Sequence, residues 1–183
     1  VTITATYEVT QGTPTITNFV VPAKTVGDAS FAIVAPTSNS DGAFTYTSSD
    51  PEVATIEGST VTIVGAGTTT ITASQASNAN FTAATTTATM TVNKATPTIS
   101  SFSAITKTFG DATFNITPPS SNSSGLITYT SSNRLVATIA DNSINIVGAG
   151  SCTIGATQAS TANYATGIIT ASLVVSKATT SMI

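Results

Sequence analysis

Apolar and hydroxyl-bearing side chains alternate along most of this chain with a period of two residues. In Thr60-Val61-Thr62-Ile63, Val61 and Ile63 share one face and the two threonines share the other. No stretch keeps a helical period, and β-branched residues are too dense for helices. Clusters of Gly, Pro, Asn, Asp and Ser interrupt the runs at a spacing of roughly 8–12 residues. The pattern therefore predicts an all-β protein built from short strands.

Seven strands are predicted in the first half of the chain, a number typical of an immunoglobulin-like β-sandwich. They cover residues 15–19, 30–34, 43–48, 53–57, 60–64, 68–75 and 82–93. The positions expected to face inward are Ile16, Phe19, Phe31, Ile33, Phe44, Tyr46, Val53, Ile56, Val61, Ile63, Ile71, Ala73, Ala88, Met90 and Val92. At about 1.5–3 kcal/mol for each fully buried side chain, such a core offsets the chain entropy of one small domain with little to spare.

The second half of the chain repeats the first half without a gap. The tetrapeptide TPTI at residues 13–16 returns at residues 96–99, which sets a period of 83 residues. A fixed period decides the architecture, because each copy is expected to form the same structural unit. We therefore interpret residues 13–95 and residues 96–178 as two tandem immunoglobulin-like β-sandwich domains.

Short pieces flank the two copies. Residues 1–12 align with the end of the repeat, so we interpret them as the last strand of a preceding repeat, which needs a partner from elsewhere. Residues 179–183 are interpreted as the start of a next repeat or a tail, and the chain as an excerpt of a longer array. The boundary between the copies falls near Lys94–Pro97, where Pro97 fixes φ and holds Thr96 extended. This predicts a semi-rigid connection.

Two copies of one motif carry a family resemblance. Residues 48–73 read SSDPEVATIEGSTVTIVGAGTTTITA, and residues 131–156 read SSNRLVATIADNSINIVGAGSCTIGA. The Ser-Ser pair, the Val-Ala-Thr-Ile segment, the Gly-Ala-Gly turn and the alternating strand resemble the bacterial immunoglobulin-like group 2 (BIg2) family. A Trp that often precedes the Ser-Ser pair in that family is Tyr46 and Tyr129 here, a change that the core should tolerate.

The resemblance implies a fold and a setting. Domains of this family occur as tandem arrays in bacterial adhesins and surface-layer proteins. Similar arrays occur in tail and fibre proteins of phages and in structural proteins of large DNA viruses. The family has no common catalytic residue. The resemblance therefore implies a non-enzymatic scaffold at an extracellular location, a cell surface or a virion surface.

Composition excludes several functional classes. Charged residues make up 7% of the chain, and Lys and Arg total five, which is too few for a nucleic-acid-binding face. The chain has no histidine, so His-based catalytic triads and zinc sites with histidine are excluded. No apolar run approaches 18 residues, and we predict no membrane insertion. Thr, Ser and Asn supply the polarity that charges usually supply.

Three kinds of residue are candidates for a functional role. Cys152 aligns with Thr69 on an inward-facing position, so we expect a buried, unreactive thiol rather than a nucleophile. Asp28 and Asp111 are the acidic residues that recur, and an Asx turn after a glycine suits them better than calcium. The Gly-Ala-Gly turn of residues 65–67 could cradle phosphate, but strand formers follow it, so we interpret it as a tight reversal.

Other recurring or patterned residues gave weaker alternatives. Lys24 with Asn39, and Lys107 with Asn122, recur and could form an intramolecular isopeptide bond only beside a buried carboxylate. Three Asn-x-Ser/Thr sequons begin at Asn80, Asn115 and Asn122, and none recurs as a sequon one period away. The sequence therefore predicts no catalytic, cofactor-binding or metal site.

Two functional classes remain, with a third alternative. A structural repeat array would form a stalk, fibre or layer whose partners are neighbouring repeats of the same chain. A binding module would recognise surface glycan or protein through its loops, although the chain offers no Trp for an aromatic platform. Lateral assembly with copies of itself or with other surface or virion proteins is the third, because a Thr-rich surface with few charges does little to prevent edge pairing.

Overall fold

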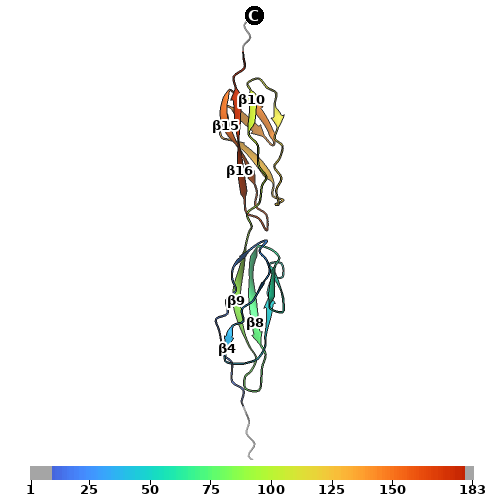
Figure 1. Ribbon diagram of the computed structural model, residues 1–183, viewed down its shortest axis with the longest axis vertical. Helices are drawn as coiled ribbons and strands as arrows, with labels where there is room; N and C mark the ends of the chain where they lie inside the picture. The colour runs from blue at the N-terminus through green and yellow to red at the C-terminus, as the bar shows by residue number, and fades with distance from the viewer. Residues whose placement is uncertain (1–9, 180–183) are drawn as a thin grey trace, which may run out of the picture. The chain divides into compact units, whose positions relative to one another are not determined.

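The computed structural model describes residues 10–179 and divides into two compact units, the first ending at Lys94 and the second beginning at Ala95 (Figure 1). Every secondary-structure element assigned in the described residues is a β-strand, so the protein is all-β, as the alternation predicts. Residues 1–9, which carry most of the strand assigned to a preceding repeat, lie outside the described residues, as do residues 180–183.

The described part of unit 1, residues 10–94, contains nine strands. They are β1 (Ile16–Thr17), β2 (Lys24–Thr25), β3 (Phe31–Ala32), β4 (Thr37–Ser38), β5 (Phe44–Ser48), β6 (Ala54–Glu57), β7 (Thr60–Ile63), β8 (Gly67–Gln75) and β9 (Ala84–Asn93). One sheet has the order β2-β9-β8-β5 and the other the order β3-β7-β6, while β1 and β4 form a separate short ladder. Among these described strands, β2 pairs with β9 in parallel and the other pairs are antiparallel, while an isolated parallel bridge joins Gly12 to Phe81.

Unit 2 has the same two sheets. Its strands are β10 (Ile105–Thr108), β11 (Phe114–Asn115), β12 (Ile127–Ser131), β13 (Ala137–Ala140), β14 (Ser143–Ile146), β15 (Gly150–Gln158) and β16 (Gly167–Ser176). The sheet orders are β10-β16-β15-β12 and β11-β14-β13. In place of the β1–β4 ladder, unit 2 has a single bridge between Ile99 and Ser121. The period of 83 residues therefore relates two copies of one fold.

The core of each unit lies between its two sheets. In unit 1 the buried cluster is Val21, Ile33, Val53, Ala54, Val61, Ile71, Met90 and Val92. In unit 2 it is Ile116, Val136, Ala137, Ile144, Cys152, Ile154, Leu173 and Val175. In each unit, both sheets contribute residues to the buried cluster of that unit, which is the packing of a β-sandwich. Val21 and Ala54 are the residues of this cluster that the alternation did not place in the core.

The predicted strands agree with the structure except near the start of the unit. The strand expected over residues 15–19 is only β1, and the strands β2 and β4 were not predicted. Each of these strands is two residues long, too short to show an alternating pattern. The parallel pairing of β2 with β9 joins residues far apart in sequence, so no local pattern marks it. The described residues contain no helix that is long and apolar enough to cross a membrane.

Candidate functional site

A buried glutamine side chain fixes one loop of unit 1. Gln75, the last residue of β8, is 2% exposed. Its Nε2 donates to the carbonyl oxygens of Ser40 and Gly42, both at 2.9 Å. The hydroxyl of Ser38 donates to its Oε1 at 2.7 Å. The amide is therefore satisfied by the loop that precedes β5, and this loop is tied to the end of β8.

Unit 2 repeats this arrangement bond for bond. Gln158 is 1% exposed, and its Nε2 donates to the carbonyl oxygens of Ser123 at 2.8 Å and Gly125 at 3.0 Å. The hydroxyl of Ser121 donates to its Oε1 at 2.7 Å. We call these contacts the glutamine lock. Neither glutamine is predicted above as a buried residue, although each continues the series of alternate residues that face the core.

A second polar cluster occurs only in unit 1. The hydroxyl of Thr69 lies 2.8 Å from the hydroxyl of Ser48 and 3.2 Å from that of Ser49, and it accepts the Asp50 backbone N–H at 3.0 Å. The equivalent residue in unit 2 is Cys152, which is 7% exposed and packs in the core. The prediction that this thiol is buried is confirmed. Its register on β15 places it in line with Ile154, as the alternation requires.

The recurring aspartates close tight turns by bonding to the third residue before them. Asp28 Oδ2 accepts the Thr25 backbone N–H at 2.9 Å, and the Asp28 N–H donates to the Thr25 carbonyl oxygen at 3.0 Å. Asp111 makes the same two bonds to Thr108, both at 3.0 Å. The glycine before each aspartate has a positive φ, 93° at Gly27. The expected turn at each Gly-Asp pair is therefore present, but it is not an Asx turn, in which the carboxylate would accept the backbone N–H two residues further along the chain. Among the described residues, no three His, Cys, Asp or Glu side chains lie close enough to hold a metal ion.

The recurring lysines and asparagines have separate partners. Lys24 Nζ lies 4.8 Å from the centroid of the Phe31 ring, a cation–π distance. Asn39 Oδ1 instead accepts the Thr15 backbone N–H at 2.8 Å, as Asn122 Oδ1 accepts that of Thr98 at 2.8 Å. Both residue types are therefore engaged in local contacts, and the geometry offers no support for an isopeptide bond. The three sequon asparagines are exposed.

The Gly-Ala-Gly turn has a packing reason for its last glycine. Gly67 has a φ of 157°, and a Cβ added there would lie 2.8 Å from Val53 Cγ2. Gly150, one period later, has a φ of 146°, and its added Cβ would lie 3.0 Å from Val136 Cγ2. Strand β8 begins at Gly67 itself, so the turn leads into a strand and not into a helix N-terminus. The interpretation as a reversal between strands is confirmed.

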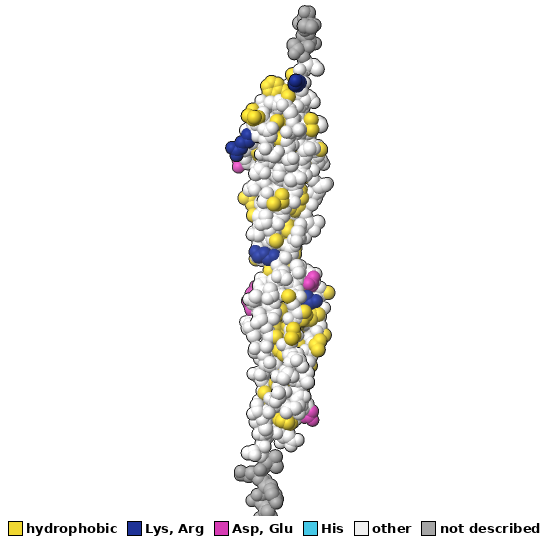
Figure 2. Space-filling view, turned by 90° about the vertical axis from the view of Figure 1, so that its left-hand side faces the viewer, with side chains coloured by type: hydrophobic (Ala, Val, Ile, Leu, Met, Phe, Trp, Pro, Cys, Tyr) yellow, Lys and Arg dark blue, Asp and Glu magenta, His cyan; other side chains and the backbone are white. Residues whose placement is uncertain are grey.

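The outward face of the larger sheet in unit 1 carries ranks of threonine. Thr70 lies opposite Thr89, and Thr72 lies opposite Thr87. The hydroxyls of these four residues make no hydrogen bond within the described residues, so they are available to water or to a partner. The equivalent face of unit 2 includes Ile168, which is largely exposed. On the face drawn in Figure 2, most of the surface is neither charged nor hydrophobic.

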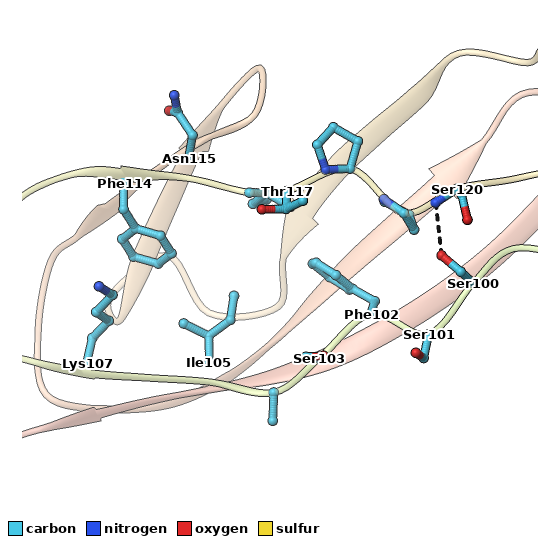
Figure 3. A pocket seen from close by; sticks show the side chains of 14 residues that line it. Ser100, Ser101, Phe102, Ser103, Ile105, Lys107, Phe114, Asn115, Thr117 and Ser120 are labelled. Atoms are coloured by element: carbon cyan, nitrogen blue, oxygen red, sulfur yellow. Dashed lines mark hydrogen bonds between the residues drawn. The ribbon is translucent and has the colours of Figure 1, made fainter.

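A groove of about 620 Å³ opens on one side of unit 2, between residues 100–107 and residues 114–120 (Figure 3). Phe102 and Ile105 point toward it from the first stretch, and Phe114 points toward it from the second. These three side chains also pack against the buried core of the unit. We call this feature the unit 2 groove; these three side chains form its apolar part, and serine, threonine and asparagine residues also line it.

The two ends of the unit 2 groove are polar. At one end Lys107 Nζ lies 4.5 Å from the centroid of the Phe114 ring. At the other end the Ser120 backbone N–H donates to Ser100 Oγ at 2.9 Å (Figure 3). No carboxylate lines the groove. The only charged side chain in contact with the groove is therefore a cation.

A difference between the repeats explains the shape of this region. In unit 1, Val21 is 6% exposed and belongs to the core, whereas its equivalent Ala104 is exposed. Pro22 has no N–H to donate, but its equivalent Ile105 begins β10 and pairs with Leu173. The parallel strand is therefore two residues longer in unit 2, and Ile105 rather than Ala104 packs against the core.

Tyr129 lies beside the unit 2 groove, with its ring centroid 6.2 Å from that of Phe102. Its hydroxyl is buried and has no hydrogen-bond partner among the described residues. Its ring borders two further grooves, of about 670 Å³ and 210 Å³. Burial raises the pKa of Tyr129 above its ordinary value, as it raises the pKa of Tyr46 in unit 1. Both phenols therefore stay neutral at physiological pH.

Comparison with known proteins supports the fold. The family profile of the intimin immunoglobulin-like domain matches residues 36–77. Both units have the immunoglobulin-like β-sandwich fold. No curated protein sequence matches this chain.

Several solved structures are similar at low identity. Human protocadherin-24 EC1-2 is 15% identical over 91% of this chain and 99% of that chain, with a TM-score of 0.37. Domains 4 and 5 of the S-layer protein SbsC are 21% identical over 73% of this chain and 70% of that chain, with a TM-score of 0.32. A SusE-like surface located polysaccharide binding protein from Bacteroides thetaiotaomicron is 12% identical over 88% of this chain and 34% of that chain, with a TM-score of 0.35.

Proposed function

We propose that this chain is part of a non-catalytic structural repeat array of BIg2-like tandem domains. Such an array forms a stalk, fibre or layer at an extracellular location, on a cell surface or on a virion. Its partners are neighbouring repeats of the same chain, copies of itself or other proteins of the same surface. The array keeps a distance or builds a layer, and it transforms no substrate.

The observation that carries this proposal is the kind of residue that recurs after 83 positions. The glutamine lock, the turn closed by Asp28 or Asp111 and the Lys–Phe contact each recur, and each is satisfied within its own unit. The single thiol does not recur, since Cys152 stands where unit 1 has Thr69. A repeat that keeps its structural contacts and varies everything else suits a scaffold better than an enzyme.

The connection between the units also supports the proposal. Asn93 is the last residue of β9, and Ala95 already pairs with Tyr164 inside unit 2. Only Lys94 lies between these two residues. A connection of one residue restricts the swivelling that a flexible linker would allow, so we expect the array to keep its reach.

Small-angle X-ray scattering tests this expectation. The wild-type chain should give a narrow distribution of distances between the units. Inserting a flexible Gly-Ser segment between Lys94 and Ala95 should broaden it, because a flexible segment spans about 5–6 Å times the square root of its length. A matched control places the same segment in the exposed turn at Gly58 and Ser59, where it should leave the distribution unchanged. A broad distribution for the wild-type chain would overturn the structural role.

A second candidate function is adhesion through surface glycan or protein. The groove beside Tyr129 favours it, because it is a concave feature that a spacer does not need. A screen of the whole chain against immobilised glycans and surface proteins tests this role. Binding that survives changes in the connection between the units would favour adhesion, and the absence of any ligand would favour the scaffold.

A further inference from the structure

We propose that the unit 2 groove binds a small amphipathic carboxylate, with the apolar body in the groove and the carboxylate at Lys107. This inference goes beyond the structural role and does not depend on it. A scaffold that keeps its reach can carry such a site on one repeat, and a failure of either idea leaves the other standing.

The interior of the groove suits an apolar group. Phe102, Ile105 and Phe114 line it and shield it from one side by packing on the core. Its volume of about 620 Å³ falls within the range of about 300–1,000 Å³ that is usual for small-molecule sites. An apolar ligand placed there would cover carbon surface that water now contacts, which is the main source of affinity in such sites.

The charge at the groove suits an anion. Lys107 is half-buried, and the Phe114 ring beneath its Nζ holds the ammonium at the end of the groove. Of the two acidic residues of unit 2, Asp111 accepts the Thr108 N–H and Asp141 borders a different groove. A ligand carboxylate is therefore the group that would pair with this ammonium.

The polar side chains around the groove disfavour a saccharide. Figure 3 shows Asn115 and Ser101 directed away from the two phenylalanine rings. Ser100 Oγ already accepts the Ser120 N–H at the far end. A sugar would therefore leave several of its hydroxyls without partners against the apolar interior, and this costs free energy.

Unit 1 provides a natural comparison within the same chain. It has the same cation over the same ring, Lys24 over Phe31, at 4.8 Å. At the position of Ala104, however, it has Val21, whose side chain is buried in the core. The segment before Lys24 therefore packs differently from the segment before Lys107, although both lysines keep the same register against the last strand of their units. We expect the site on unit 2 alone.

Titration of the full chain tests the proposal. Octanoate and phenylpropanoate represent an aliphatic and an aromatic source of the same chemistry, and octanol and phenylpropanol are their uncharged controls. We expect one site per chain, with NMR shifts confined to the residues of the groove. Lys107→Gln should weaken binding of the preferred acid about tenfold, the effect of losing a charge-assisted hydrogen bond. The matched control, Lys24→Gln, should leave the affinity unchanged.

A second pair of variants exchanges the distinguishing residues between the repeats. Ala104→Val with Ile105→Pro gives unit 2 the residues of unit 1 and should abolish binding. Val21→Ala with Pro22→Ile should create a second site and raise the stoichiometry to two. If the first exchange unfolds unit 2, the Lys107→Gln comparison decides by itself. The proposal is overturned if neither acid binds the wild-type chain, if the alcohols bind as tightly as the acids, or if Lys107→Gln and Lys24→Gln have equal effects.

Discussion

The two repeats agree in their buried polar contacts. They differ in the segment that leads into the parallel strand, which is residues 21–22 in unit 1 and residues 104–105 in unit 2. Gln75 and Gln158 make the same three hydrogen bonds, with donor–acceptor distances that agree within 0.1 Å. In contrast, Val21 is a core residue and Ala104 is exposed. The constant part ties a loop to the sheet, and the variable part shapes a groove.

This difference reflects the cost of leaving polar groups unpaired. A buried amide that loses one partner leaves a desolvated donor or acceptor behind, so a change at any member of the lock is penalised. An apolar residue in the segment before the parallel strand can be replaced by its neighbour, because hydrophobic contacts have no required direction. Val21 packs in the core of unit 1, whereas Ile105, one position further along in the repeat, packs against the core of unit 2. Surface charge varies more freely still. Residues 13–95 carry two lysines and five carboxylates, whereas residues 96–178 carry three cations and two carboxylates.

The largest effect is expected from the glutamine lock. Gln75→Leu and Gln158→Leu should each lower the free energy of unfolding of their unit by about 2–4 kcal/mol, because three polar groups lose their partner in a buried site. Urea denaturation followed by NMR of each unit would measure the two losses. Thr87→Ala, on the outward face, serves as the control and should stay within about 0.5 kcal/mol. Clearly unequal losses would show that the two locks are not equivalent.

A smaller effect on stability, confined to unit 1, is expected at Val21 and its equivalent Ala104. Val21→Ala should cost about 1–3 kcal/mol in unit 1, because it removes two methyl groups from a buried site. Ala104→Val should change the stability of unit 2 by less than about 0.5 kcal/mol, because that position is exposed. The same urea transitions measure both. Equal effects would mean that the two first segments pack alike, which contradicts the comparison.

At the position shared by Thr69 and Cys152, Thr69→Cys should lower the free energy of unfolding by about 1 kcal/mol, whereas Cys152→Thr should not lower it. Thr69→Cys removes a hydroxyl that has three polar neighbours, whereas Cys152→Thr adds one beside Ser131. Thermal unfolding of both variants provides the measurement. In the native wild-type chain, a thiol reagent should label Cys152 only as fast as the unit opens, because the thiol is buried. Immediate labelling would contradict the buried position.

The smallest effect at neutral pH concerns the two tyrosines. Tyr129→Phe should be neutral or stabilise unit 2 by up to about 1 kcal/mol, because it removes a buried hydroxyl without a partner. Above pH about 10 both tyrosines should matter more. Burial raises their folded pKa, so the folded state keeps protons that the unfolded state loses, and stability falls as pH rises. Unfolding measured from pH 8 to pH 11 should show this loss, and the Phe variants should reduce it; an unchanged slope would contradict it.

The sequence by itself determined the strands, the repeat and most of the core. Alternation is a local property, and it correctly placed Val61, Ile71 and Met90 inside. The same alternation continues inward to Gln75, so the buried glutamine could have been found by asking which polar residue falls on the core face. The Gly27–Asp28 turn was also predictable, because it is closed by Thr25 and Asp28, which are only three positions apart.

Only the tertiary structure decided the partners of Gln75 and the existence of the unit 2 groove. The lock joins β8 to a loop more than thirty residues earlier, as its bond from Gln75 to Ser40 shows. The groove depends on whether Val21 or Ile105 enters the core, and that choice follows from a parallel pairing with a strand at the far end of the repeat. Local patterns specify which face of a strand is buried. Contacts between distant segments specify what that face meets, and these contacts form only when the chain has folded.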